Sequence, residues 1–168
     1  MITTKSINNK ISIQLLDKSD YNSIEKIVNM IKEGSKAGAF NIYPNLNTES
    51  FSRYLNYGNY PSSHEILLGE KNSNVIGFVE INKLKDNIWE IPRIFVDREL
   101  RKNDIGNILL KSTLDQINKN DKNCGFVVLT IYDPNEASKA LFSKFKFKYT
   151  GISEYDEGGR YNIYQLRL

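Results

Sequence analysis

Hydrophobic and polar positions recur at regular spacings along the chain, and these patterns predict the elements of its first third. Residues 10–16 alternate between apolar and polar, which is typical of a half-buried strand. Apolar residues recur at every third or fourth position from 24 to 31, which predicts an amphipathic helix ending at Gly34 or Gly38. A second, shorter helix is expected at 47–57, with a polar residue at its start.

The remaining two thirds read as strands and helices in alternation. Strands are expected at 65–70, 75–84, 88–96, 125–131, 147–155 and 160–168, and helices at 104–118 and 134–145. The nearly continuous apolar run at 125–131 is typical of a strand covered on both faces. The order β-α-α-β-β-β-α-β-α-β-β predicts a mixed α/β layer structure.

Composition narrows the class of protein. With 168 residues, 40% of them hydrophobic and 26% charged, we expect one soluble domain over residues 1–168. The net charge is +3 and the basic residues are interspersed with acidic ones, so no nucleic-acid partner is expected. No apolar run approaches the ~18 residues of a membrane span, and one cysteine fits a reducing compartment, so we expect a cytoplasmic, bacterial protein without membrane contact.

One strand-to-helix junction carries candidate chemistry. The apolar run that ends at Val96 is followed by a short basic turn and a helix that starts near Asp104. The first amides of a helix lack partners and attract anions, and Arg101 and Lys102 strengthen that field. The pattern Arg101-x-x-Asp104-x-Gly106-Asn107 therefore predicts an anion-binding loop.

A second motif follows one strand later. The segment at 135–147, NEASKALFSKFKF, resembles Asn-x-x-Ala-x-x-Leu-Tyr-x-Lys-x-Gly-Phe, and the 101–107 loop resembles a coenzyme A pyrophosphate loop. Both patterns, in this order, resemble the GNAT superfamily of acyl-CoA N-acyltransferases, whose element order extends over essentially the whole chain. The resemblance implies a central, mostly antiparallel, twisted sheet of about seven strands that splays between strands 4 and 5, flanked by about four helices.

The resemblance also implies a reaction and its site. Acetyl-CoA is the expected co-substrate, no metal is expected, and a primary amine of a small molecule or peptide would attack the thioester directly. The backbone amide of Ile94 would face the thioester oxygen. The residues implied in coenzyme A binding are Ile94, Phe95, Val96, Arg101, Lys102, Asn103, Asp104, Ile105, Gly106, Asn107, Asn135 and Phe142. Homodimers are common in this family, so a homodimer is a possible assembly.

The chain departs from the family pattern at three positions. Asp104 stands where the family has a glycine; it either repels phosphate or caps the helix and turns away, and we expect the cap. Phe142 replaces the tyrosine that protonates the leaving thiolate, which makes a non-catalytic acyl-CoA-binding module the alternative function. Lys146 replaces the glycine of the Gly-Phe pair and is expected to form a helix end. Pro92, by contrast, agrees with the family: it interrupts the strand at 88–96, where the resemblance implies a bulge.

The acidic residues of two neighbouring strands are the candidates for the general base. Glu90 is the first candidate, and Glu80, with an expected raised pKa, is the second. His64 and Cys124, the single histidine and cysteine, build no triad or metal cluster and are expected to be structural or exposed.

The remaining site residues stay open. Tyr132, Tyr155 and Tyr161 are equivalent candidates for the proton donor. The amine acceptor is expected between residues 34–60 and the last hairpin, where Glu154, Asp156 and Glu157 would attract a cation or simply be solvated.

Overall fold

The computed structural model describes residues 10–36, 45–57, 64–154 and 160–168. The strands are β1 (Ser12–Leu15), β2 (Glu65–Lys71), β3 (Asn74–Lys85), β4 (Ile88–Val96), β5 (Phe126–Tyr132), β6 (Lys148–Glu154) and β7 (Arg160–Arg167). The helices are α1 (Tyr21–Lys36), α2 (Thr48–Tyr57), α3 (Ile105–Asn120) and α4 (Glu136–Lys144), with a 3-10 turn, η1, at Arg98–Leu100. This element order confirms the mixed α/β fold expected from the sequence.

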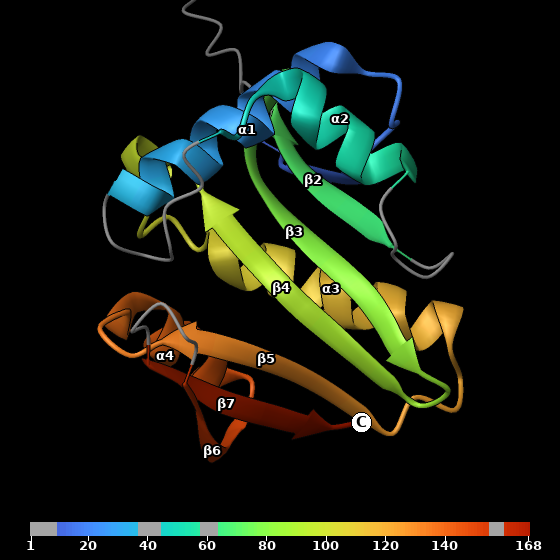
Figure 1. Ribbon diagram of the computed structural model, residues 1–168, viewed down its shortest axis with the longest axis vertical. Coiled ribbons are helices and arrows are strands. Elements are labelled where there is room, and N and C mark those ends of the chain that lie inside the picture. Colours follow the sequence, from blue (N-terminus) through green and yellow to red (C-terminus); the bar gives the residue numbers. More distant parts are fainter. Residues whose placement is uncertain (1–9, 37–44, 58–63, 155–159) are drawn as a thin grey trace, which may run out of the picture.

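The strands form one seven-stranded sheet in the order β1-β2-β3-β4-β5-β7-β6. Neighbours are antiparallel except β4 and β5, which are parallel. These two strands pair only between Ile88–Glu90 and Phe126–Val128, and beyond that point they diverge (Figure 1). The expected splay between strands 4 and 5 is therefore confirmed.

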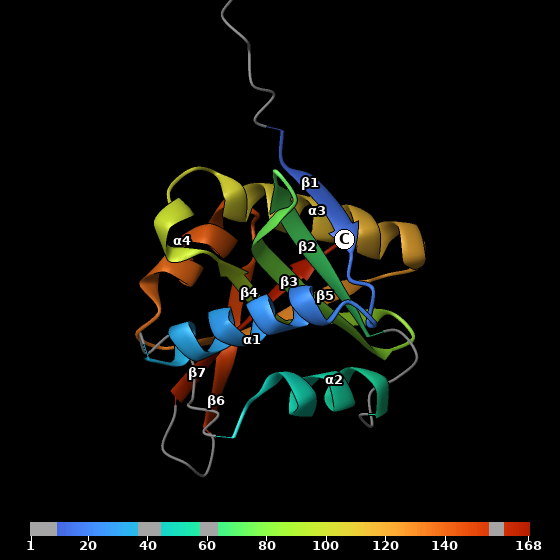
Figure 2. The ribbon, with the colours of Figure 1, turned by 90° about the horizontal axis from the view of Figure 1, so that it is seen from above.

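Helices cover both faces of the sheet (Figure 2). On one face, α1 and α2 pack over a core that includes Ile27, Phe78 and Phe95. On the other face, α3 and α4 cover a core that includes Leu109, Val127 and Phe142. Because apolar residues recur along one side of α1 with helical spacing, that side is buried and the opposite side faces water.

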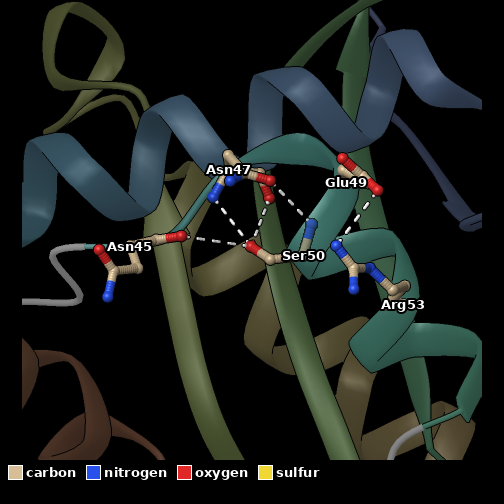
Figure 3. A network of polar contacts seen from close by, with 5 residues as sticks. All are labelled: Asn45, Asn47, Glu49, Ser50 and Arg53. Atoms are coloured by element: carbon tan, nitrogen blue, oxygen red, sulfur yellow. Dashed lines mark hydrogen bonds and ion pairs between the residues drawn. The ribbon is translucent and has the colours of Figure 1, made fainter.

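The start of α2 is fixed by side-chain hydrogen bonds (Figure 3). The Asn47 side chain accepts a hydrogen bond from the Ser50 amide at 2.8 Å, as an N-cap does. The Ser50 hydroxyl contacts the Asn47 and Asn45 carbonyls at 3.0 and 3.5 Å. One turn further, Arg53 and Glu49 form an exposed ion pair at 3.1 Å. These bonds satisfy helix-start groups and set where α2 begins.

One strand expectation is wrong. Burial along β5 alternates, with Val127, Leu129 and Ile131 buried and Thr130 exposed. The reason is the divergence from β4, which leaves the other face of β5 open instead of covered. Strand β1 is four residues long and lies within the range 10–16 expected from the sequence.

Candidate active site

A cleft of about 760 Å³ lies where β4 and β5 diverge. Its walls are β4, the loop into α3, the end of β5, and α4. Of the first base candidate, Glu90, and the residues implied in coenzyme A binding, all line the cleft except Asn103: Glu90, Ile94, Phe95, Val96, Arg101, Lys102, Asp104, Ile105, Gly106, Asn107, Asn135 and Phe142. Glu80, the second base candidate, does not line it. The two sequence motifs therefore meet in space at one cleft.

A β-bulge shapes the β4 wall. Between Glu90 and Arg93, β4 has two residues, Ile91 and Pro92, where β3 has one. The bulge lies where Pro92 predicted it, because proline has no amide to donate to the ladder. As a result, Glu90 and Arg93 lie on the same face of the sheet, the face covered by α1 and α2.

The amides of β4 beyond the bulge point into the gap. The Asp97 amide donates to the Ile76 carbonyl of β3 at 2.9 Å. Amides point to alternate sides along a strand, so those of Ile94 and Val96 are turned toward β5, where the gap lies. In agreement, the Val96 carbonyl accepts a hydrogen bond from Arg101 Nε at 3.1 Å. The strand thus presents backbone groups that an extended ligand can pair with.

The loop into α3 contains two residues with left-handed backbones, Lys102 (φ 68°) and Asp104 (φ 63°). Asp104 occupies the N-cap position, but its side chain makes no cap hydrogen bond. The expectation of a capping Asp104 is therefore wrong. An N-cap needs an extended backbone to bring its side chain onto the helix amides, and here the carboxylate instead accepts a hydrogen bond from the Asn107 side chain.

The mouth of the cleft is basic and narrow. The Arg101 guanidinium lies 5.0 Å from the centre of the Phe95 ring, which holds the side chain against the end of β4. A Cβ at Gly106 would contact Leu141 of α4 at 3.4 Å, so α3 and α4 approach each other here. A small residue at 106 keeps the backbone near the helix start accessible.

Helix α4 forms the opposite wall. Asn135 caps it, because its side chain accepts a hydrogen bond from the Ser138 amide at 3.1 Å. Phe142 is buried, with its ring 5.3 Å from that of Phe147, so no hydroxyl exists at the position where the family has tyrosine. Lys146 has a left-handed backbone (φ 65°) and forms the helix end, as expected from its place before Phe147.

Two of the tyrosine candidates lie together in the cleft wall. Tyr132 of β5 and Tyr161 of β7 are register partners with ring centroids 5.4 Å apart. Both line the cleft. Tyr155 lies outside the described residues, as do Asp156 and Glu157, and nothing is described of the Glu154 side chain.

Glu90 stands at the closed end of the cleft, where β4 and β5 still pair. Burial raises the pKa of its carboxyl group. A hydrogen bond with Asn82 and the positive charge of Arg93 oppose that rise, and the negative charge of Glu80 adds to it. A carboxylate with a raised pKa at the closed end of a cleft is suited to accept a proton.

Glu80 is completely buried on the same face. Burial alone would raise the pKa of Glu80, but His64, Arg93 and Tyr54 outweigh it and hold the pKa below its usual value. The expectation of a raised pKa at Glu80 is therefore wrong. A saturated, charged carboxylate of this kind is a poor proton acceptor.

Four residues make up what we call the polar cluster: Tyr54, His64, Glu80 and Arg93. Glu80 Oε1 accepts from the Tyr54 hydroxyl at 2.5 Å and contacts His64 Nε2 at 2.8 Å. Glu80 Oε2 pairs with the Arg93 guanidinium. The sequence indicated a structural or exposed His64 and placed Tyr54 in the helix expected at 47–57, with no role in the reaction. The only sequence signal for the cluster was a carboxylate, Glu80, inside an apolar strand.

Within the described ranges, His, Cys, Asp and Glu side chains form no group of three or more that is suited to a metal ion. None of the helices in these ranges combines the length and apolar character that a membrane span requires.

Comparison with known proteins gives a consistent result. A model of the acetyltransferase (GNAT) family matches residues 31–147. No curated protein matches the sequence. Similar solved structures include the GNAT-family acetyltransferase of Streptococcus pneumoniae, with a TM-score of 0.76, 18% identity, and coverage of 95% of this chain and 99% of that one.

Two further structures share the fold. The N-acetyltransferase of Staphylococcus aureus Mu50 has a TM-score of 0.74 and 22% identity, with coverage of 94% and 98%. A candidate acetyltransferase of Salmonella typhimurium, solved with its cofactor acetyl-CoA, has a TM-score of 0.74 and 18% identity, with coverage of 95% of both chains. At these identities the likeness concerns the fold.

Proposed function

Because the chain belongs to the GNAT acetyltransferase family, we propose that it transfers the acetyl group of acetyl-CoA to a primary amine of a small molecule or peptide. The observation that carries this proposal is the cleft between β4 and β5, which has Glu90 at its closed end and turns the Ile94 amide into the gap. Amide formation from a thioester requires a base and an oxyanion donor, and both lie in this one cleft.

The residues of the cleft fit acetyl-CoA in three respects. The Ile94 and Val96 amides offer strand-like pairing to an extended pantetheine arm. The amides at the start of α3, beside Arg101 and Lys102, suit the pyrophosphate. Asn135 lines the wall between them.

Each residue then has a defined part in the reaction. Glu90 takes a proton from the acceptor ammonium, directly or through water, so that the nitrogen attacks the thioester carbonyl carbon. The Ile94 amide donates a hydrogen bond to the carbonyl oxygen as negative charge develops there, a contribution near ~3 kcal/mol. The carbon–sulfur bond then breaks. In this proposal Tyr132 or Tyr161 protonates the leaving thiolate and is reprotonated, directly or through water, by the second proton that the nitrogen loses as the amide forms.

Replacing Glu90 with glutamine tests the proposal. Turnover, measured as thiol release, should fall by about 100-fold, most strongly at low pH where the acceptor amine is protonated. Calorimetry should show unchanged acetyl-CoA binding. The exposed Glu49→Gln is the matched control and should keep full activity. A wild-type pH profile in Glu90→Gln would remove Glu90 from the role of base.

A second function is favoured by one observation, the buried Phe142 at the tyrosine position. Without that hydroxyl, the domain would bind acyl-CoA and not turn it over. Calorimetric binding of acetyl-CoA together with no thiol release across a panel of amines would support this second function. Thiol release with any amine would exclude it.

A further inference from the structure

Arg93 lies at the boundary between the polar cluster and the cleft. The bulge at Ile91 and Pro92 turns it to the same face as Glu90, and both residues line the cleft. Its side chain is 19% exposed, whereas that of Glu80, its ion-pair partner, is 0% exposed. The guanidinium therefore reaches from a dry carboxylate toward the space where an acceptor would lie.

The polar cluster holds this arginine from behind. Tyr54 and His64 both contact Glu80 Oε1, which leaves Oε2 directed at Arg93. The Tyr54 ring also lies 6.0 Å from the guanidinium carbon. Residues from α2, from the position before β2 and from β3 thus converge to fix one cation on β4. A guanidinium fixed in this way has already lost the side-chain freedom that ligand binding would otherwise cost.

A fixed guanidinium beside a general base selects the acceptor by charge. Arginine binds carboxylates through a planar set of donors, with better geometry than lysine provides. A cationic acceptor without an acidic group, such as a polyamine, has no carboxylate to pair with Arg93. An acceptor with a carboxylate near its amino group meets both residues, its nitrogen at Glu90 and its carboxylate at Arg93.

We propose that Arg93 is a specificity-determining residue that binds the carboxylate of the acceptor, and that the acceptor is an amino acid or a similar zwitterion. This inference rests on the acetyltransferase function proposed above. It assigns Tyr54, His64 and Glu80 as positioning residues, which act through Arg93 and not on the substrate itself.

The test compares acceptors that differ only in the carboxylate. Each of the twenty protein amino acids is offered with acetyl-CoA beside its primary amide, and N-acetylated products are measured by mass spectrometry. We expect at least one acid to react with a kcat/KM about 100-fold above that of its amide. Amides that react as well as or better than every acid would overturn the inference.

Variants of Arg93 then assign the effect. Arg93→Gln should lower kcat/KM for the preferred acid by about 100-fold more than it lowers kcat/KM for the matching amide. Arg93→Lys, which keeps the charge and loses the planar fork, should give an intermediate acid-to-amide ratio. The exposed Arg53→Gln is the matched control and should keep the wild-type ratio. An equal loss with acid and amide in both Arg93 variants would contradict the proposed role.

Binding separates this inference from the proposed function. If acetyl-CoA binds but no acceptor is acetylated, the transferase function fails, and thermal shifts of the coenzyme A-loaded protein still test Arg93. An acid should then raise the melting temperature more than its amide does, and Arg93→Gln should abolish the difference. Equal shifts in the wild-type protein would refute the carboxylate site by itself.

Discussion

The 101–107 loop and the polar cluster both bring charge to the cleft. The loop follows the end of β4, whereas the cluster meets β4 at Arg93, within the strand. The loop is one run of seven consecutive residues, exposed from Arg101 to Asp104, and Lys102 and Asp104 have left-handed backbones. The cluster joins residues 54, 64, 80 and 93, and its carboxylate is completely buried. The loop is strained and open to water, whereas the carboxylate of the cluster is shielded from water and hydrogen-bonded by its neighbours.

This difference separates what each region controls. Exposed charges are screened by water and salt, so changes in the loop should alter ligand affinity and leave the fold intact. A buried carboxylate with three donors is tied to the packing of α2, β3 and β4, so its loss should be felt as a loss of stability. Substitutions in both regions test this separation.

The largest expected effect is that of Glu80→Ala. Removing the buried carboxylate leaves His64, Tyr54 and Arg93 without their shared acceptor, and the free energy of unfolding should fall by about 3 kcal/mol. Urea denaturation measures it. Glu49→Ala, which breaks the exposed pair with Arg53, should cost below about 0.5 kcal/mol. Comparable losses at both sites would remove the distinction between cluster and surface.

The same carboxylate predicts a pH dependence. The pKa of Glu80 is lower in the folded protein than in the unfolded chain, so its contribution is complete above the unfolded value of about 4.3 and is lost as pH falls through the folded value. In Glu80→Gln this part of the acid destabilisation should be missing. Urea midpoints measured below pH 5 will therefore fall less steeply in Glu80→Gln than in the wild-type protein.

An intermediate effect is expected from Asp104→Gly. Glycine adopts the left-handed backbone without cost, and the change removes a carboxylate from the anion loop, so coenzyme A should bind about tenfold more tightly. Lys102→Gly relieves similar strain but removes a positive charge, so it should weaken binding by a similar factor. Titration calorimetry at low and high salt checks both, and the gap between them should narrow as salt rises.

The smallest effect compares two helix caps, one beside each region. Asn47 caps α2, which carries Tyr54 of the cluster, and Asn135 caps α4 at the cleft. Either alanine variant should lower the free energy of unfolding by about 1 kcal/mol. Only Asn135→Ala should also raise the KM for acetyl-CoA, because only Asn135 lines the cleft. A raised KM in Asn47→Ala would show that the two regions are coupled.

The same contrast explains how far the sequence could be interpreted. The loop and the α4 motif are each a continuous segment of the chain, so the sequence alone showed their residue pattern and their position after a strand. The bulge was also predictable, because Pro92 cannot donate to the ladder. The backbone angle of Asp104 was not visible, and with a left-handed φ the cap expected from its residue type did not form.

The polar cluster depends on tertiary structure. Tyr54 and His64 come to Glu80 only because α2 and the start of β2 pack over the face that the bulge gives to Arg93. No spacing in the sequence joins these positions. The pKa of Glu80 followed the same logic: burial was predictable from its apolar neighbours, but the donors that reverse its effect were not.

The short seam between β4 and β5 has a mechanical consequence. The sheet has two parts, strands β1 to β4 and strands β5, β7 and β6, and only three register pairs connect them. A molecule that pairs with β4 inside the gap would add further contacts between these two parts of the sheet. Ligand binding would then also make the sheet more rigid. The strands that carry the reacting groups would therefore be held in place by the substrate itself.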